Sequence, residues 1–454
     1  MDFIGLLPDF GNLLYTVAAF VLALAVIVTV HEFGHYFIGR ISGIRAEVFS
    51  FGFGPRLAWF EDRHGTRWQI SAIPLGGYVK FLGDANAASA SADAKVMAHL
   101  TADERRMTMH GAPVWARAAT VAAGPVFNFI LSIAIFAGMF LWTGTPTDQP
   151  TVGTLAALPA GSGEIKPGDR IVAIAGFETP DYTALAAVVD QVPGAAQLDY
   201  LVERGGAQML ISGPALFPAR LAGIGAGSAA ADAGLQPGDV VLRADGTDLV
   251  RFGDLQQAVT QADGAEIALS VWRPGPQAGA QGAETLAVTL TPRRTDLPLR
   301  EGGFESRLLI GASGDFFFTP ATRPTGMFEA AQGAVSETWF IAKSSLSGMW
   351  HMVTGAISSC NLRGPIGIAE VSAQAAATSA QSFIWFIAVL STAVGLLNLF
   401  PIPVLDGGHL VFHAWEAATG KPPAQRVLNV LITLGLVLVL SLMVFGLSND
   451  IFCP

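Results

Sequence analysis

Charged residues are scarce in this 454-residue chain: Asp, Glu, Lys and Arg make up 14% of it, against about 25% in ordinary soluble domains. The mean hydropathy is correspondingly high, at +0.48. A composition this apolar indicates that part of the chain lies in lipid. The net charge of −10 argues against the basic surface typical of proteins that bind nucleic acids, so we expect no nucleic acid among the partners and a lipid bilayer instead.

Four long apolar runs account for this composition, and each is long enough to cross a bilayer, which takes about 20 residues. They occupy residues 13–38, 114–142, 383–415 and 427–447. The first run lacks a basic leader, because Asp2 and Asp9 precede it and no Lys or Arg does. A cleaved signal peptide begins with positive charge, so we interpret this run as a retained transmembrane helix.

The loops between the predicted spans differ in their content of Lys and Arg, and this difference predicts which side of the membrane each loop faces. Arg40 and Arg45 follow the first run, and Lys421 and Arg426 lie between the third and fourth, whereas residues 118–164 hold no Lys or Arg. Loops rich in basic residues stay in the cytoplasm. We therefore expect both termini and the long stretch between the second and third spans to lie on the outer side of the membrane.

Cysteine is nearly absent, with Cys360 and Cys453 as the two examples. The predicted orientation places both on the outer side, where a disulfide could persist. Because nothing in the sequence brings the two residues within bridging distance, we expect two unpaired thiols.

The connection after the first span, residues 39–113, has the pattern of short strands. "RLAWFED" and "TRWQISAIPL" flank Arg63-His64-Gly65, which predicts a β-hairpin turn. "GGYVKFLGD" continues in the same manner, and residues 85–102, rich in Ala, Ser and Asp, are expected to form a mobile loop.

The outer stretch contains an internal repeat. "IKPGDRIVAIAG" (165–176) matches "LQPGDVVLRADG" (235–246), each with a Pro-Gly-Asp turn, a short apolar strand and a glycine turn. The text resembles the permuted PDZ module, and it predicts one such domain over 151–213 and another over 214–296. "GSAAADAG" predicts a short helix before the second copy, and the first copy lacks its equivalent. PDZ domains bind extended peptides by strand addition, but a role as spacer or size filter is an equal alternative.

After these domains, residues 325–370 predict an amphipathic helical segment at the outer membrane face.

The chemistry begins with "HEFGH" at the end of the first span. Residues four apart share one face of a helix, so His31 and His35 can bind one metal ion with Glu32 beside them. This is the H-E-x-x-H pattern of zinc hydrolases. A charged group in the middle of a membrane helix costs about 2.5–3.5 kcal/mol, and such residues usually mark function.

A catalytic zinc site needs a third protein ligand. The first two spans offer few other candidates, whereas "NLFPIPVLDGGHLVFH" in the third offers Asp406, His409 and His413. Pro401 and Pro403 predict a break in this helix, which a membrane protein tolerates where it lines a polar cavity. Spacing alone does not decide between Asp406 and His409.

These motifs together resemble the site-2 protease family of intramembrane zinc metalloproteases. "HEFGH", "LNLFPIPVLDGGH", "IPLGGYVKFLGD", "GPVFNFILSI" and "NLRGPIGIAE" carry the resemblance over almost the whole chain. It implies that Zn²⁺ is bound by His31, His35 and Asp406, with Glu32 as the catalytic acid and base. It further implies substrate contacts at Asn398 and Asn361 and along a membrane-reentrant hairpin of Gly76, Gly77, Tyr78, Val79 and Lys80.

The sequence thus predicts a polytopic membrane protein with four transmembrane helices, a membrane-associated β-hairpin region and two periplasmic PDZ-like α+β domains. The resemblance implies a multi-pass protein of the bacterial inner membrane. Its expected substrates are transmembrane segments of single-pass proteins, such as pre-trimmed anti-sigma factors and remnant signal peptides. The alternative is a catalytically inactive membrane scaffold that binds peptides through its PDZ-like domains.

Overall fold

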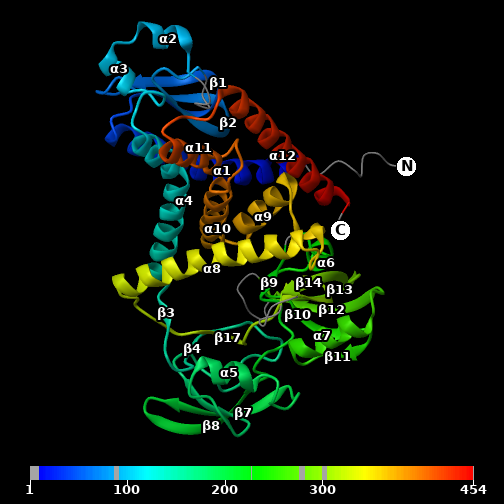
Figure 1. The fold of residues 1–454 in the computed structure, drawn as a ribbon. Helices are drawn as coiled ribbons and strands as arrows, with labels where there is room; N and C mark the ends of the chain where they lie inside the picture. Colours follow the sequence, from blue (N-terminus) through cyan, green and yellow to red (C-terminus); the bar gives the residue numbers. More distant parts are fainter. Residues whose placement is uncertain (1–9, 86–91, 226, 276–281, 299–303, 453–454) are drawn as a thin grey trace. The chain divides into compact units, whose positions relative to one another are not determined.

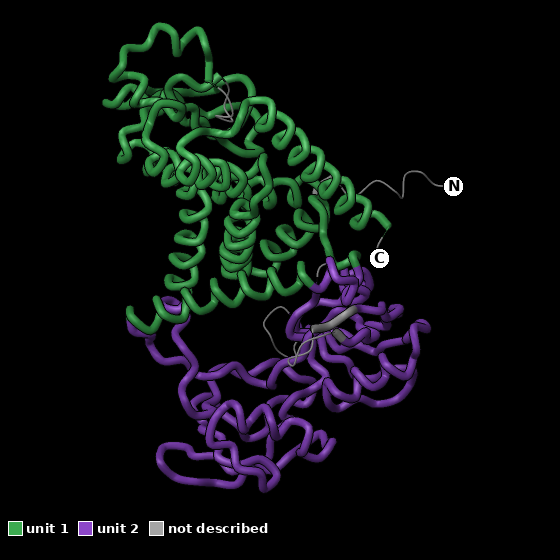
Figure 2. The backbone as a smooth tube through the Cα atoms, viewed as in Figure 1, with its two compact units in different colours: residues 1–139, 327–350, 359–453 green, residues 140–326, 351–358, 454 purple. Residues whose placement is uncertain are grey.

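The computed structural model describes residues 10–85, 92–225, 227–275, 282–298 and 304–452. They form two compact units (Figure 2). Unit 1 comprises residues 1–139, 327–350 and 359–453, and unit 2 comprises residues 140–326, 351–358 and 454. The predicted metal ligands all belong to unit 1, and the repeated sequence belongs to unit 2.

The described residues contain four helices that are long and apolar enough to cross a membrane, as predicted. These are α1 (Phe10–Ile41), α4 (Val114–Thr143), α10 (Ala380–Asn398) and α12 (Gln425–Phe452). The third is shorter than expected, because the helix ends at Asn398 and not at Trp415. The polypeptide from 399 to 405 is not helical, and α11 (Asp406–Thr419) begins after it. The predicted break at Pro401 and Pro403 is confirmed.

Helices α1, α4 and α10 lie close together (Figure 1). Ala23 and Ile27 of α1 form a buried cluster with Ile387 of α10, and the hydroxyl of Ser132 on α4 donates to the Ala388 carbonyl of α10. A Cβ atom added to Gly34 would lie 2.5 Å from the carbonyl oxygen of Ala123, so only glycine allows α1 to approach α4 this closely. Close approach of small residues is the usual way in which helices associate in lipid.

The break before α11 is equally tight. A Cβ atom on Gly407 would lie 2.2 Å from the carbonyl oxygen of Phe400, and one on Gly408 would lie 2.4 Å from that of Ile402. The two glycines therefore let α11 fold back on the segment that precedes it. Further along α11, Glu416 receives two hydrogen bonds, of 2.7 and 3.0 Å, from the guanidinium of Arg117 on α4. This forked pair fixes α11 against α4.

The predicted hairpin consists of β1 (Ala46–Glu61) and β2 (Arg67–Phe81). Residues 46–51 pair with residues 77–81, and residues 56–61 pair with residues 67–71. The loop expected over 85–102 is partly wrong, because α2 (Ala94–His99) begins behind an Asp93 cap and α3 (Ala102–Arg106) follows a Thr101 capping box. Residues 86–91 of that expected loop lie outside the described part of the chain.

The amphipathic segment contains α8 (Met327–Val353), a 3₁₀ turn η2 (Ser359–Asn361) and α9 (Pro365–Thr378). The carboxylate of Asp450 on α12 accepts the amide hydrogens of Gly364 and Ile366 and so caps α9. Cys360 is disulfide-bonded, so the expectation of an unpaired thiol is wrong for this residue. Cys453, the other cysteine of the chain, lies outside the described residues.

Unit 2 contains two four-stranded sheets built in the same order, β6-β5-β7-β8 and β11-β10-β12-β13. The first copy has α5 (Tyr182–Val188), and the second has α6 (Ala229–Asp232) and α7 (Phe252–Gln261). The strands are β5 (Arg170–Ile174), β6 (Phe177–Glu178), β7 (Gln197–Arg204), β8 (Ala207–Pro214), β10 (Val240–Ala244), β11 (Thr247–Asp248), β12 (Ile267–Arg273) and β13 (Glu284–Leu290). The described residues 156–169 contain no helix, so the predicted difference between the copies is confirmed.

The two sheet domains are not simple consecutive blocks. A later segment returns to both of them, since β16 (Ala312–Ser313) pairs with β9 (Gly223–Ile224) and β17 (Phe318–Pro320) pairs with β4 (Val152–Leu155). Phe317 and Phe318 are fully buried in the core of the first domain. In a third pair, β18 (Thr322–Arg323) pairs with β3 (Thr145–Pro146), so the first and last strands of the unit are neighbours. Separately, β14 (Arg293–Pro298) pairs with β15 (Phe304–Leu309).

Candidate metal centre

Two imidazoles lie on one face of α1, as the four-residue spacing predicts. The Nε2 atoms of His31 and His35 are 3.1 Å apart, and the rings meet edge to face. His31 is 8% exposed. Because α1 is apolar along its length, these side chains lie at a buried polar point of a helix that otherwise contacts apolar neighbours.

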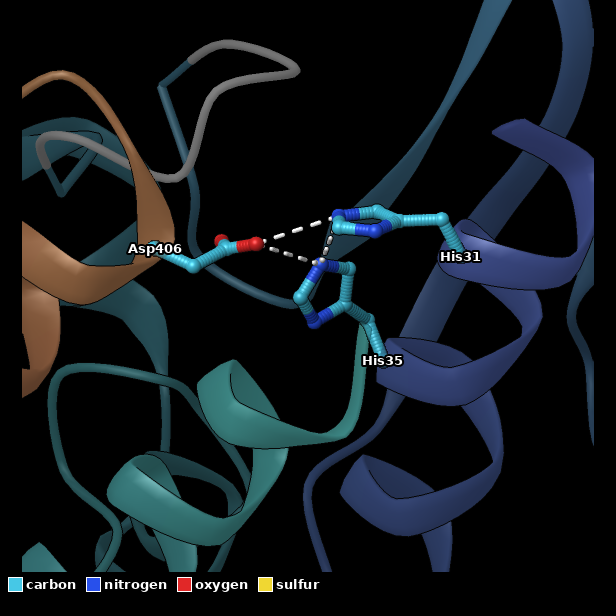
Figure 3. Close-up of side chains that lie close together, drawn as sticks. All are labelled: His31, His35 and Asp406. Carbon is cyan, nitrogen blue, oxygen red and sulfur yellow. Dashed lines mark hydrogen bonds and ion pairs between the residues drawn. The ribbon is translucent and has the colours of Figure 1, made fainter. Parts of the chain in front are cut away.

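The third group comes from the first residue of α11. Oδ2 of Asp406 lies 3.1 Å from Nε2 of His31 and 3.6 Å from Nε2 of His35, and Figure 3 shows the three side chains pointing at one another. The three ligand atoms all lie within 4.8 Å of one another, which is the spacing around a single metal ion. This geometry selects Asp406, where spacing in the sequence left His409 as an equal candidate.

The chemistry of this donor set fits a divalent metal such as zinc. Oδ2 of Asp406 is buried and faces the Nε2 atoms of the two imidazoles, and burial is costly for a carboxylate oxygen unless a cation neutralises it. Nδ1 of His35 lies 2.8 Å from the carbonyl oxygen of Thr120, and a carbonyl only accepts. The proton of His35 is therefore on Nδ1, and the lone pair of Nε2 faces Asp406 and His31.

Glu32 lies beside the two histidines and faces the hairpin. Its Oε2 accepts a 3.1 Å hydrogen bond from the backbone amide of Val79 on β2. Glu32, Val79 and the three candidate ligands line one cavity of about 540 Å³. A carboxylate in this position can exchange a proton with a water molecule in the cavity.

Some of the residues predicted to be third-ligand candidates or substrate contacts line the same cavity as the candidate ligands, and the others do not. Asn398, the last residue of α10, lines the cavity, as do His409 and His413. Of the five hairpin residues, Val79 lines it, whereas Gly76, Gly77, Tyr78 and Lys80 do not. Asn361 lies in η2 and is not among the residues that line the cavity.

As expected, the second span supplies none of the three candidate ligands, but it supports the imidazoles, which the sequence analysis did not predict. Helix α4 places three residues against the imidazoles: the Thr120 carbonyl contacts His35, Asn128 contacts His31, and Gly124 lies between them. A buried Asn in an apolar helix is a signal for such a role, and "GPVFNF" contains one. The carbonyl of Thr120 has no signal in the sequence, because every residue carries that group.

Comparison with known proteins shows the family of this chain. The model of "Peptidase family M50" matches residues 19–442. A "putative zinc metalloprotease" of Agrobacterium fabrum is 35% identical over 97% of this chain and 97% of its own length. "Regulator of sigma-E protease RseP" of Salmonella typhimurium is 34% identical over 97% of this chain and 99% of its own length. The resemblance to the site-2 proteases is therefore confirmed, and this chain belongs to peptidase family M50.

Proposed function

We propose that the protein is a zinc-dependent endopeptidase that cuts transmembrane segments within the bilayer. The observation that carries the proposal is the convergence of His31, His35 and Asp406 on one point, with Glu32 alongside, in helices apolar enough for a membrane. Relatives named as zinc metalloproteases over nearly the full length support it. His31, His35 and Asp406 hold the ion in this proposal.

Zinc supplies a Lewis acid that polarises the scissile carbonyl and makes a bound water more acidic. Glu32 takes a proton from the attacking water and passes it to the nitrogen of the leaving amine. The amide of Val79 holds Oε2 of Glu32 in place while it does so. The cavity gives water a place beside Glu32, which an apolar helix interface would exclude.

The substrate class follows from the same cavity. A transmembrane helix hides its carbonyls in its own hydrogen bonds, so the segment has to be unwound before cleavage. Residues 77–81 of β2 pair with β1 along one edge, and the Val79 amide points from the other edge into the cavity. An unwound segment adds to this second edge as a strand, along Gly76, Gly77, Tyr78, Val79 and Lys80, with Asn398 at the cavity wall and Asn361 as a further contact.

The location and the outer domains complete the proposal. The protein lies in a bacterial inner membrane, with both termini and unit 2 in the periplasm, and exposed Trp59 and Phe60 on β1 support contact of the hairpin with lipid. The two sheet domains, predicted over 151–213 and 214–296, are PDZ-like and exclude single-pass proteins whose outer domains have not been trimmed. Anti-sigma factors and remnant signal peptides are substrates of this class.

The test combines metal analysis with a reconstituted cleavage assay on the full chain in detergent or liposomes. We expect about one zinc per chain and cleavage of a model transmembrane substrate, with loss of cleavage but not of zinc in Glu32→Gln. Glu178→Gln is a matched control, because Glu178 is exposed on β6 of unit 2 and does not line the cavity. Full cleavage by Glu32→Gln would contradict the role of Glu32, and a wild-type chain that binds no zinc and cleaves nothing would favour the scaffold alternative.

A further inference from the structure

One face of α4 is built around the two imidazoles. Thr120, Gly124 and Asn128 are spaced four residues apart and so share that face. Gly124 leaves room, since a Cβ atom there would lie 2.4 Å from Nε2 of His35 and 2.7 Å from Nε2 of His31. The backbone carbonyl of Thr120 accepts the hydrogen bond from Nδ1 of His35. Asn128 is the remaining member of the face, and it is fully buried.

Asn128 makes an incomplete set of hydrogen bonds. Its Nδ2 lies 3.2 Å from Nδ1 of His31, while its Oδ1 is buried and has no hydrogen-bond partner among the described residues. The backbone around it is well held, because the hydroxyls of Ser132 and Ser391 donate to the Asn128 carbonyl at 3.0 and 2.9 Å. The unsatisfied oxygen is therefore a property of the side chain and not of a misplaced helix.

The orientation of the carboxamide determines where His31 carries its proton. With Nδ2 donating to Nδ1, the proton of the neutral imidazole is on Nε2, the atom that faces Asp406 and His35. An imidazole that binds a metal through Nε2 carries its proton on Nδ1 instead. Two donors, Nδ1–H and Nδ2–H, would then face each other.

A half-turn of the carboxamide removes this conflict. The oxygen and nitrogen of a carboxamide have nearly the same size, so the rotation needs no extra space. It places Oδ1 opposite Nδ1 of His31 as the acceptor that the imidazole requires, and it moves Nδ2 to the position in which Oδ1 has no hydrogen-bond partner among the described residues.

We propose that Asn128 is a positioning residue for the metal centre: its Oδ1 accepts the Nδ1 hydrogen of His31 and so keeps Nε2 free to bind zinc. Asn128 thus does for His31 what the Thr120 carbonyl does for His35. The inference rests on the proposed zinc site, but it is separate from the roles of the ligands and of Glu32.

The experiment measures zinc affinity of the purified full chain by competition with a chromophoric chelator. Asn128→Leu keeps most of the volume and removes the acceptor, and we expect zinc affinity to fall about 10- to 100-fold, the usual effect of losing a hydrogen-bond partner of a metal-bound histidine. Asn128→Asp keeps an acceptor and should restore affinity to within a few-fold of wild type. Ser391→Ala removes only a bond to the Asn128 backbone and should leave affinity unchanged.

The outcomes separate this inference from the proposed function. If wild type binds no zinc, the metal site itself is wrong and both fail. If wild type binds zinc and a folded Asn128→Leu binds it equally well, the role of Asn128 alone is overturned. Should that variant not fold, nitrogen-15 NMR of histidine-labelled wild type gives the answer: zinc-loaded His31 protonated at Nδ1, with that hydrogen bonded to the Asn128 carboxamide, is expected, and a solvent-bonded or absent Nδ1 hydrogen contradicts the proposal.

Discussion

At the scale of single residues, the repeated Pro-Gly-Asp turns of unit 2 each bury one carboxylate. Asp169 accepts two hydrogen bonds from Arg204 and one from the Lys166 amide. Asp239 does the same with Arg273 and the Gln236 amide. The aspartate in the motif therefore ties the turn to a neighbouring strand, which explains why both copies carry it.

This carboxylate makes the stability of the first sheet domain depend on pH. Burial raises the pKa of Asp169, but hydrogen bonds from Arg204 and Lys166, with the charge of Arg204, outweigh it and hold the pKa below its usual value. The stabilisation is therefore present above the ordinary aspartate pKa of about 3.9 and is lost as the pH falls through the lower folded value. We expect Asp169→Asn to cost about 2 kcal/mol at pH 7, measured by urea denaturation, with the difference from wild type shrinking below about pH 4. A pH-independent difference between Asp169→Asn and wild type would contradict the argument.

The glycine turns that follow hold a strained residue in one copy. Ala175 and Asp245 occupy equivalent places, each with a φ of +47°, a left-handed conformation that costs an ordinary residue about 1–2 kcal/mol and that Asn and Asp tolerate better. We expect Ala175→Asn to raise the free energy of unfolding of unit 2 by about 1 kcal/mol, measured by the same denaturation. The reverse change, Asp245→Ala, should lower it, and equal stability of both variants and wild type would count against strain at this turn.

At the scale of elements, α4 supports the candidate metal centre through a backbone carbonyl, that of Thr120, and through the space left by Gly124. Gly124→Ala should strengthen the helix, since alanine is the better helix former. It should nevertheless remove stoichiometric zinc, because the new Cβ would lie within 2.7 Å of both Nε2 atoms. Zinc analysis with circular dichroism tests this.

The same helix provides the control. Gly138 has no atom within 4 Å of its would-be Cβ, so Gly138→Ala makes the identical chemical change and should leave zinc content unchanged. Zinc loss in both variants would point to a general effect on α4 and not to the space between the imidazoles.

Local patterns in the sequence predict much of this architecture, and non-local contacts explain the rest. His31 and His35 are predictable because four residues of one helix set their geometry, and the break before Asp406 follows from two prolines. The choice of Asp406 over His409 depends on how α11 folds back on Gly407 and Gly408, which spacing does not encode. Likewise α2 forms where an alanine-rich loop was expected, because the Asp93 side chain caps it.

At the scale of the whole molecule, the later strands of unit 2 determine how its outer domains can be removed. Cutting out residues 151–292 alone would leave Phe317 and Phe318 without the core that buries them. Residues 147–321 form a better excision, because Pro146 and Thr322 are paired neighbours and a short Gly-Ser linker can join them.

We expect this excision to permit cleavage of substrates that retain their outer domains, if unit 2 acts as a size filter. The measurement is cleavage of an untrimmed and a trimmed model substrate by the shortened and the full chain, with Glu32→Gln in the shortened chain as the control for background proteolysis. A shortened enzyme that cuts the trimmed substrate and still leaves the untrimmed one intact would rule out the filter.

The position of Asp406 has a consequence for biosynthesis. The two imidazoles emerge from the ribosome early, whereas the carboxylate lies 371 residues after His35, since 406 − 35 = 371. A nascent chain therefore has two of the three donors, but not the third, while these 371 residues are translated. If these three residues bind the ion, a chain that ends before Asp406 lacks the third donor, and we expect it to bind no zinc and to cleave nothing.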